Sequence, residues 1–203
     1  MNDNIKARTA KNKLAAMRGR QCTKQENTKN ENRSTMNFGM NKYYKYTDTD
    51  TDTDDVDCFL ELDKEFYCLR AIYNIGKEYI STNLTIEDER YFLPEGSFSD
   101  SLEYMTETTE AEFLEKWGSA ILPHLENWTK LKIELAIGQR IQSKILCFYP
   151  QGIVCEIGKA FYGIANYNEC ESYFGSDKMR VGERLDLIIS EFDNDNLWLK
   201  LQI

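Results

Sequence analysis

Arg140-Ile141-Gln142-Ser143-Lys144-Ile145, followed by Gly152-Ile153-Val154-Cys155-Glu156-Ile157 and Gly163-Ile164-Ala165, is the stretch that decides the fold. Apolar and polar residues alternate in the first run, and the alternation returns near the end of the chain. A period of two is typical of strands with one buried face, and glycine permits the strong coiling of a small barrel. We therefore predict an all-β barrel of five strands, over residues 140–148, 152–157, 161–167, 184–192 and 197–203.

The order of these strands and glycines resembles the S1 RNA-binding motif, the domain repeated in ribosomal protein S1, over residues 137–203. Val181-Gly182 stands where that family has a turn before its fourth strand. Residues 168–180 take the place of the helical turn between strands three and four. The resemblance implies an OB barrel that grips single-stranded RNA with exposed aromatic side chains and a basic groove.

Most of the RNA-contacting positions that the resemblance implies hold other residues in this chain. Gln151 and Val154 stand where RNA-binding S1 domains project two aromatic residues from strand two. Asn166 replaces a histidine on strand three, Asn196 replaces an arginine near the last turn, and Asp193 is kept. Each lost base stack is worth roughly 1–3 kcal/mol, so losing two would weaken RNA binding about a hundredfold or more.

Other aromatic residues of the barrel are candidates to replace these contacts. Tyr149 and Tyr162 lie near predicted loop ends, and Trp198 and Lys200 are predicted to face outward on the last strand, where they would form a shifted stacking site. The alternative for Trp198 is packing against the N-terminal unit. The RNA-binding candidates are therefore Tyr149, Gln151, Val154, Tyr162, Asn166, Asp193, Asn196, Trp198 and Lys200.

Charge divides the chain into a basic start and an acidic remainder. Residues 1–46 hold eleven Lys and Arg against three Asp and Glu, and the rest holds 14 against 31, for a net charge of -9. The first segment is poor in apolar residues, which predicts a disordered basic tail over 1–46. We interpret it as a solvated extension with a weakly amphipathic stretch at Ala7–Met17, and contact with RNA or a membrane surface is the alternative. Thr and Asp alternate over Thr47–Asp54, and charge repulsion there predicts an extended acidic linker over 47–57.

Residues 58–122 are predicted to form a small α/β or α+β unit, with strands at 59–62, 66–73 and 78–83 in a β-meander. Thr109 and Glu112 form a capping-box signal, and Phe113 and Trp117 begin an apolar stripe that predicts a helix covering the sheet. Residues 123–136 are predicted to form a helical bridge to the barrel. The unit loosely resembles small bacterial domains of unknown function, some of them found among toxin-immunity genes, and no functional residues come with that resemblance.

The remaining patterns exclude several classes of protein. No run of eighteen apolar residues occurs, so we predict no membrane partner. The six cysteines form no Cys-x-x-Cys pair, and with the single His124 they give no zinc pattern, so we predict no metal and no cofactor. We find no phosphate loop, metal triad or nucleophile–histidine pair, which predicts a protein that is not an enzyme. Cysteines in apolar, strand-like contexts are expected to be buried free thiols, which fits a reducing, cytoplasmic location.

Two functional hypotheses remain. The first is association with single-stranded RNA or the ribosome through an atypical S1-like barrel. The alternative is protein recognition, in which the body of the protein, with a net charge of -17 after residue 46, docks a basic protein.

Overall fold

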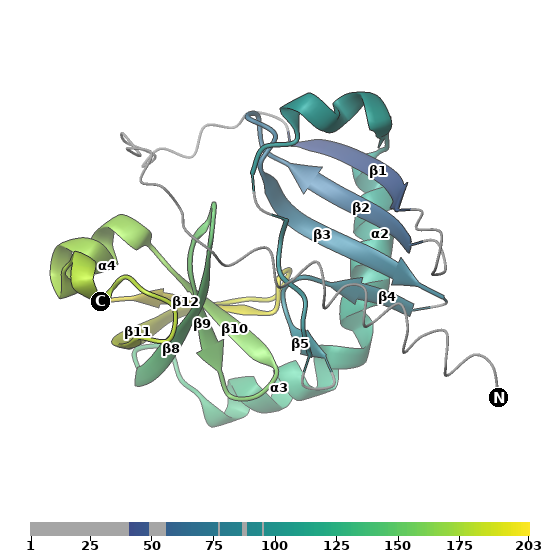
Figure 1. The fold of residues 1–203 in the computed structure, drawn as a ribbon. Helices are drawn as coiled ribbons and strands as arrows, with labels where there is room; N and C mark the ends of the chain where they lie inside the picture. Colours follow the sequence, from purple (N-terminus) through teal and green to yellow (C-terminus); the bar gives the residue numbers. More distant parts are fainter. Residues whose placement is uncertain (1–40, 49–55, 77, 87–88, 95) are drawn as a thin grey trace.

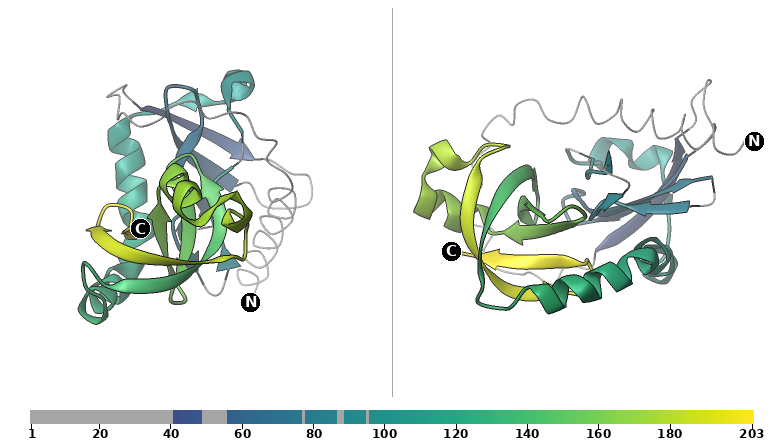
Figure 2. Two further views of the ribbon diagram at one scale, coloured as in Figure 1. Left: turned by 90° about the vertical axis from the view of Figure 1, so that its left-hand side faces the viewer. Right: turned by 90° about the horizontal axis from the view of Figure 1, so that it is seen from below.

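The computed structural model describes residues 41–48, 56–76, 78–86, 89–94 and 96–203. An antiparallel sheet and a closed barrel pack against each other, and a long helix covers the other face of the sheet (Figures 1 and 2). The predicted disordered tail lies outside the described residues except for 41–46, and only the two ends of the predicted acidic linker lie inside them.

The sheet has five strands in the order β4-β3-β2-β1-β7. Their bounds are β1 Lys42–Asp48, β2 Val56–Leu62, β3 Cys68–Ile75, β4 Glu78–Ser81 and β7 Thr106–Glu107. A separate two-stranded ribbon joins β5 Thr85–Ile86 to β6 Glu89–Arg90.

Strand β1 corrects the predicted boundaries of the tail and the linker. It lies where we predicted disorder and pairs with β2, with Asp48 opposite Val56, so the Thr-Asp repeat connects two neighbouring strands of one sheet. Tyr44 and Tyr46 pack against the buried cluster on the barrel side of the sheet. Aromatic residues favour strands, and their local preference here outweighs the polar composition of the whole segment.

Helix α2, Glu110–Ile121, confirms the predicted capping signal and the predicted packing. The Thr109 hydroxyl accepts a hydrogen bond from the backbone N–H of Glu112 at 3.1 Å. Phe113 and Trp117 are buried against Phe59 and Ile72 of the sheet. The helix covers the sheet on the face opposite to the barrel (Figure 1).

The predicted bridge is also helical. The short 3-10 helix η2, Leu122–His124, turns the chain at Pro123, and helix α3, Leu125–Glu134, follows it beneath the barrel (Figure 2). Trp128 is buried against Phe161 and Phe192 of the barrel. A further 3-10 helix, η1 Ser99–Tyr104, precedes β7.

The barrel is closed, in the strand order β10-β12-β11-β8-β9. Its strands are β8 Arg140–Tyr149, β9 Gly152–Ile157, β10 Phe161–Ala165, β11 Arg184–Asp193 and β12 Trp198–Gln202. Only β10 and β12 run parallel. All five predicted strands are confirmed, and a closed five-stranded barrel fits an OB-fold.

Local chemistry sets the ends of the barrel strands. Strand β10 ends before Asn166, whose side chain accepts the backbone N–H of Glu169 at 3.1 Å and starts helix α4, Tyr167–Phe174. That helix and the 3-10 helix η3, Ser176–Lys178, replace the predicted loop. Gly152 starts β9 at a φ of +144°, and a Cβ there would collide with the carbonyl oxygen of Ala165.

Candidate functional site

The surface on which OB-folds bind oligonucleotides lies on strands two and three and on two loops, and here the protein covers that surface with its own sheet. The outward side chains of β9, β10 and β12 join the apolar face of the five-stranded sheet in one buried cluster. Val154 is 0% exposed, Tyr162 1%, Trp198 5% and Tyr149 8%. Four of the nine RNA-binding candidates therefore lie between the sheet and the barrel.

Hydrogen bonds fix these aromatic side chains across the interface. The Tyr149 hydroxyl donates to the carbonyl of Thr82 at 3.2 Å and accepts the N–H of Leu93 at 3.1 Å. The Trp198 indole N–H donates to the carbonyl of Asn83 at 3.1 Å. Burial raises the pKa of Tyr149 well above its ordinary value, so this phenol stays neutral.

The interpretation of Trp198, Tyr149 and Tyr162 as exposed stacking residues is therefore wrong. Trp198 does face outward from the barrel, as its alternation with Leu197 and Leu199 predicted, but the outward side of β12 meets the sheet and not solvent. The alternative interpretation, in which Trp198 packs against the N-terminal unit, is the one that the structure shows.

The two loops of that binding surface are also engaged by the N-terminal unit. In the β8–β9 turn, the Gln151 side-chain amide donates to the carbonyl of Leu69 at 2.6 Å. In the β11–β12 turn, the indole of Trp117 donates to the carbonyl of Asp195 at 2.7 Å, and the Asn83 amide donates to the carbonyl of Asn196.

The Asp193 carboxylate shapes the β11–β12 turn from within. It accepts the backbone N–H of Asp195 at 3.1 Å and that of Asn196 at 3.0 Å, together with the Asn196 side-chain amide at 3.0 Å. Asn166 caps α4, and Lys200 forms an ion pair with Glu191 at 2.9 Å. The structure thus gathers Tyr149, Val154, Tyr162 and Trp198 in the interface, and it does not bring Asn166 or Lys200 into one site with them.

A second group of polar residues, centred on the buried Glu61, lies between the sheet and α2. The carboxylate of Glu61, only 4% exposed, pairs with Arg70 and accepts hydrogen bonds from Asn41 at 2.7 Å and from the Tyr43 hydroxyl at 3.3 Å. Glu61 is buried although it carries a charge, because β2 is covered on both faces. The Arg70 guanidinium lies 5.0 Å from the ring centroid of Trp117, which ties the ion pair to α2.

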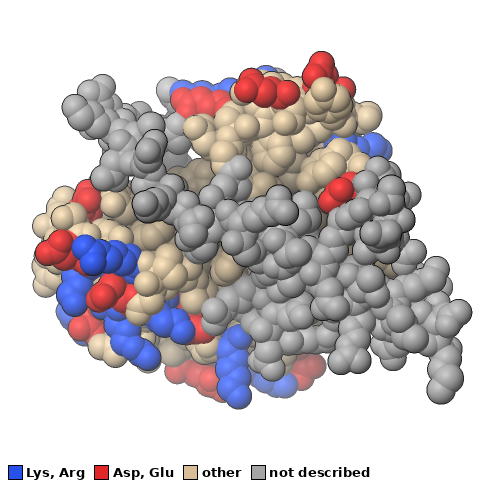
Figure 3. Space-filling view, in the orientation of Figure 1, with Lys and Arg blue, Asp and Glu red and all other residues tan. Residues whose placement is uncertain are grey.

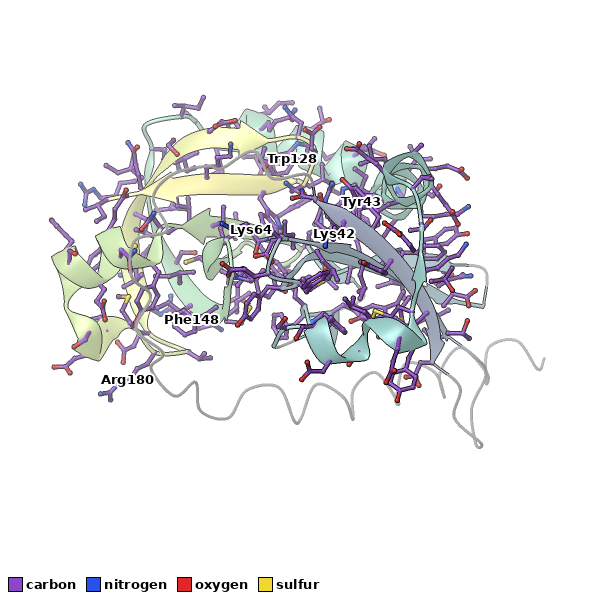
Figure 4. All side chains as sticks on the ribbon, turned by 90° about the horizontal axis from the view of Figure 1, so that it is seen from above. Lys42, Tyr43, Lys64, Trp128, Phe148 and Arg180 are labelled. Atoms are coloured by element: carbon purple, nitrogen blue, oxygen red, sulfur yellow. The ribbon has the colours of Figure 1, made fainter. Side chains whose placement is uncertain are left out.

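Tyr43 connects this group to the start of α2. Its single hydroxyl proton is shared between the Glu61 carboxylate and that of Glu110, at 3.2 Å, and burial, followed by the two carboxylates, raises the pKa of Tyr43. Every member has a partner within the protein, so we assign the group a structural role. It fixes the place where the described chain begins, beside Lys42 and Tyr43 (Figure 4).

The exposed outer side of β8 and β11 carries basic residues beside acidic ones. Arg184 lies opposite Lys144, and Arg140 lies opposite Ile188. Lys144 forms an ion pair with Glu156 at 2.8 Å. On the face shown in Figure 3, Lys and Arg alternate with Asp and Glu over the barrel, and Arg180 projects from the barrel end (Figure 4).

The most concentrated apolar surface lies on the segment that we call the helical arm, which comprises α2, η2 and α3. Eight large hydrophobic side chains of the described residues are exposed, and four of them lie on the arm. Their exposed fractions are 43% for Leu114, 65% for Leu122, 38% for Leu125 and 81% for Ile133. Ile137, at 64%, follows just beyond the arm.

The four arm residues form what we call the outer stripe. Leu122 follows Leu114 by eight residues at the end of α2, and Ile133 follows Leu125 by eight residues along α3, a spacing that keeps each pair on one side of its own helix. The arm, residues 110–134, holds five Glu and three Lys, and two of those Glu form ion pairs with lysines of the arm. The helical arm therefore presents apolar side chains among charged residues of both signs. Sequence reasoning missed these residues because the helical period predicted the buried stripe of Phe113 and Trp117 and did not show which other apolar residues of the arm stay uncovered.

No protein-family model matches the chain, and no curated protein is significantly similar to it. Within the described residues, no group of three or more His, Cys, Asp or Glu side chains is placed to hold a metal ion. No helix in the same part of the chain is long and apolar enough to cross a membrane.

Proposed function

We propose that this protein is a non-enzymatic recognition module that docks a basic protein on the outer stripe of its helical arm. The exposed apolar side chains of the outer stripe carry this proposal, and the net charge of -17 after residue 46 supports a basic partner. Contiguous exposed apolar surface rimmed by polar groups is typical of protein interaction sites. The acidic net charge of the body attracts a basic partner and disfavours acidic competitors.

Burial of the barrel face supports the same function. A base must stack on an exposed aromatic face, and Tyr149, Tyr162 and Trp198 have none to offer. Opening the sheet away from the barrel would expose the whole aromatic cluster and break the indole and phenol hydrogen bonds. The cost of that opening disfavours RNA binding at this face.

Site-specific photo-crosslinking tests the proposed surface. A benzophenone amino acid placed at Leu122 in the full chain is expected to capture a basic protein in an extract of the source cells. The matched control carries the same probe at Tyr173, which is 66% exposed on the barrel. Adding Leu114→Glu and Leu125→Glu is expected to remove the adduct at 122. Equal capture at 122 and 173, or an adduct insensitive to both substitutions, would contradict the proposal.

RNA association through an atypical S1-like barrel is the second candidate. Its support is the resemblance of residues 137–203 to the S1 motif, together with the exposed Arg140 and Arg184 and the half-buried Lys144 on the outer side of β8 and β11. The affinity for labelled single-stranded RNA, measured by fluorescence anisotropy, should then decrease in the double variant Arg140→Glu, Arg184→Glu. It should stay unchanged in Leu122→Glu. A binding curve insensitive to the arginine substitutions would remove the barrel as the RNA site.

A further inference from the structure

The turn between β11 and β12 touches both helices of the helical arm. The side-chain oxygen of Asn194 accepts hydrogen bonds from the indole N–H of Trp128 at 3.0 Å and from the Lys132 ammonium at 2.8 Å, both on α3. One residue later, the carbonyl of Asp195 accepts the indole N–H of Trp117 on α2 at 2.7 Å. Two neighbouring residues of one barrel turn therefore hold both helices, and α3 runs close to β11 and β12 (Figure 2).

The two helices pack against different parts of the protein. Trp117 of α2 is buried against the sheet, whereas Trp128 of α3 lies against Phe161 and Phe192 of the barrel. The short helix η2 between them contains Pro123, which has no backbone N–H to continue the helical hydrogen bonds from α2 into α3. A contact that both helices share therefore constrains the angle between them directly.

Asn194 constrains the rotation of α3 about its axis as well as its position. Trp128 and Lys132 are four residues apart, so their side chains lie on one face of α3, in successive turns. An oxygen atom that is bonded to both holds that face toward the barrel. Leu125 and Ile133, which α3 contributes to the outer stripe, then keep fixed directions toward solvent.

The shape of the turn itself is also fixed. The Asp193 carboxylate accepts the backbone N–H groups of Asp195 and Asn196, which sets the path of the backbone through the turn. Leu197 ends the turn at a φ of +51°, in the left-handed region that residues with a side chain rarely adopt. Its side chain is fully buried in the barrel core, so packing holds this backbone conformation in place. The two acceptors therefore face the arm from a rigid support.

We propose that the β11–β12 turn positions the outer stripe, with Asn194 as the positioning residue for α3 and the Asp195 carbonyl as the acceptor that holds α2. The stripe is divided between the two helices, so its shape depends on the angle and the rotation that the turn sets. Asn194 acts on the partner through α3. The control of arm geometry rests on the hydrogen bonds of the turn, whereas its effect on partner binding rests on the proposed function.

Distance measurements between two nitroxide labels in the full chain test the positioning. Leu114→Cys on α2 and Ile133→Cys on α3 carry the labels in a Cys22→Ser background, because the other five cysteines are buried. Double electron–electron resonance is expected to give one narrow distance distribution for this chain. Asn194→Ala is expected to broaden that distribution several-fold, because it removes both hydrogen bonds from the turn to α3.

Two further variants are matched controls. Asn194→Asp keeps an oxygen acceptor of nearly the same shape for both donors, so it is expected to retain the narrow distribution. Asn168→Ala makes the same truncation at an exposed residue of α4 and is expected to leave the distribution unchanged. An unchanged distribution in Asn194→Ala would overturn the proposal even if its urea midpoint fell. A distribution as broad in Asn194→Asp as in Asn194→Ala would overturn it as well.

Photo-crosslinking at position 122 separates this inference from the proposed function. Asn194→Ala is expected to lower the crosslink yield several-fold, and Asn194→Asp is expected to retain it. A broadened distance distribution without any crosslinked basic protein in the parent chain would leave the control of arm geometry standing and refute the recognition function. A parent chain that crosslinks a basic protein, with distribution and yield both unchanged in Asn194→Ala, would refute only the positioning role. A broadened distribution with an unchanged yield would refute the effect of the turn on partner binding.

Discussion

Replacing Trp198 by alanine separates a buried interface residue from an exposed stacking residue. The indole is 5% exposed and packs at 6.3 Å between ring centroids from Tyr149, with its N–H bonded to the carbonyl of Asn83. Truncating a buried Trp costs about 3–5 kcal/mol, and leaving a buried carbonyl without its donor costs about 1–3 kcal/mol. Because the two losses are not fully additive, we expect a decrease of roughly 4–6 kcal/mol in the free energy of unfolding.

Urea unfolding followed by far-ultraviolet circular dichroism measures this decrease. With a denaturant slope of about 2 kcal/mol per molar, the midpoint should fall by roughly 2–3 M. Trp198→Phe keeps most of the apolar contact and loses only the donor, so it should cost about 1–3 kcal/mol. The control is Lys200→Ala on the same strand, whose surface ion pair is worth less than about 1 kcal/mol.

The outcome decides between the two interpretations of Trp198. If Trp198→Ala lowers the urea midpoint no more than Lys200→Ala does, the indole is not buried. The interpretation that the sheet covers this face of the barrel would then be wrong. Loss of RNA affinity in Trp198→Ala at unchanged stability would point the same way. An unchanged RNA affinity with a large loss of stability is the result that the structure predicts.

Three further predictions concern single elements. Gly152→Ala should destabilise the protein by at least about 2 kcal/mol in thermal unfolding, because the new Cβ would collide with the carbonyl oxygen of Ala165. Gly158→Ala should cost about 1 kcal/mol, because Gly158 has a φ of +58° but no atom close to its Cβ position. Similar melting temperatures for the two variants would contradict the close approach of β9 to β10. Thr109→Ala removes the cap of α2 and should cost about 1 kcal/mol in urea unfolding, and Thr109→Ser should restore most of it. Burial raises the pKa of the Cys155 thiol to about 12, and the other described cysteines are buried as well. The Cys22→Ser variant should therefore react with an aromatic disulfide reagent near neutral pH only after it unfolds. A fast reaction of the folded variant would show that one of the described thiols is at the surface.

The barrel and α2 could be predicted because their signals are local. The alternation of apolar and polar residues along β8, β11 and β12 predicts each strand and its buried side from a few neighbouring residues, and glycine marks the places where two backbones come close. The Thr109 cap and the spacing of Phe113 and Trp117 predict helix α2 from local sequence in the same way. Strand β1 was missed because its short aromatic run lies in a long polar segment whose average composition dominated the interpretation.

The sequence by itself determined which residues of the last strand point into the barrel and which point out of it. Only the tertiary structure decided that the outward Trp198, together with Tyr149 and Tyr162, meets a second sheet, while Leu122 and Leu125 on the helical arm meet solvent. The physical reason is that periodicity distinguishes the two sides of an element but not what covers each side. A second layer, contributed by residues as far as 115 positions away in the sequence, leaves the period unchanged and converts a candidate binding face into core.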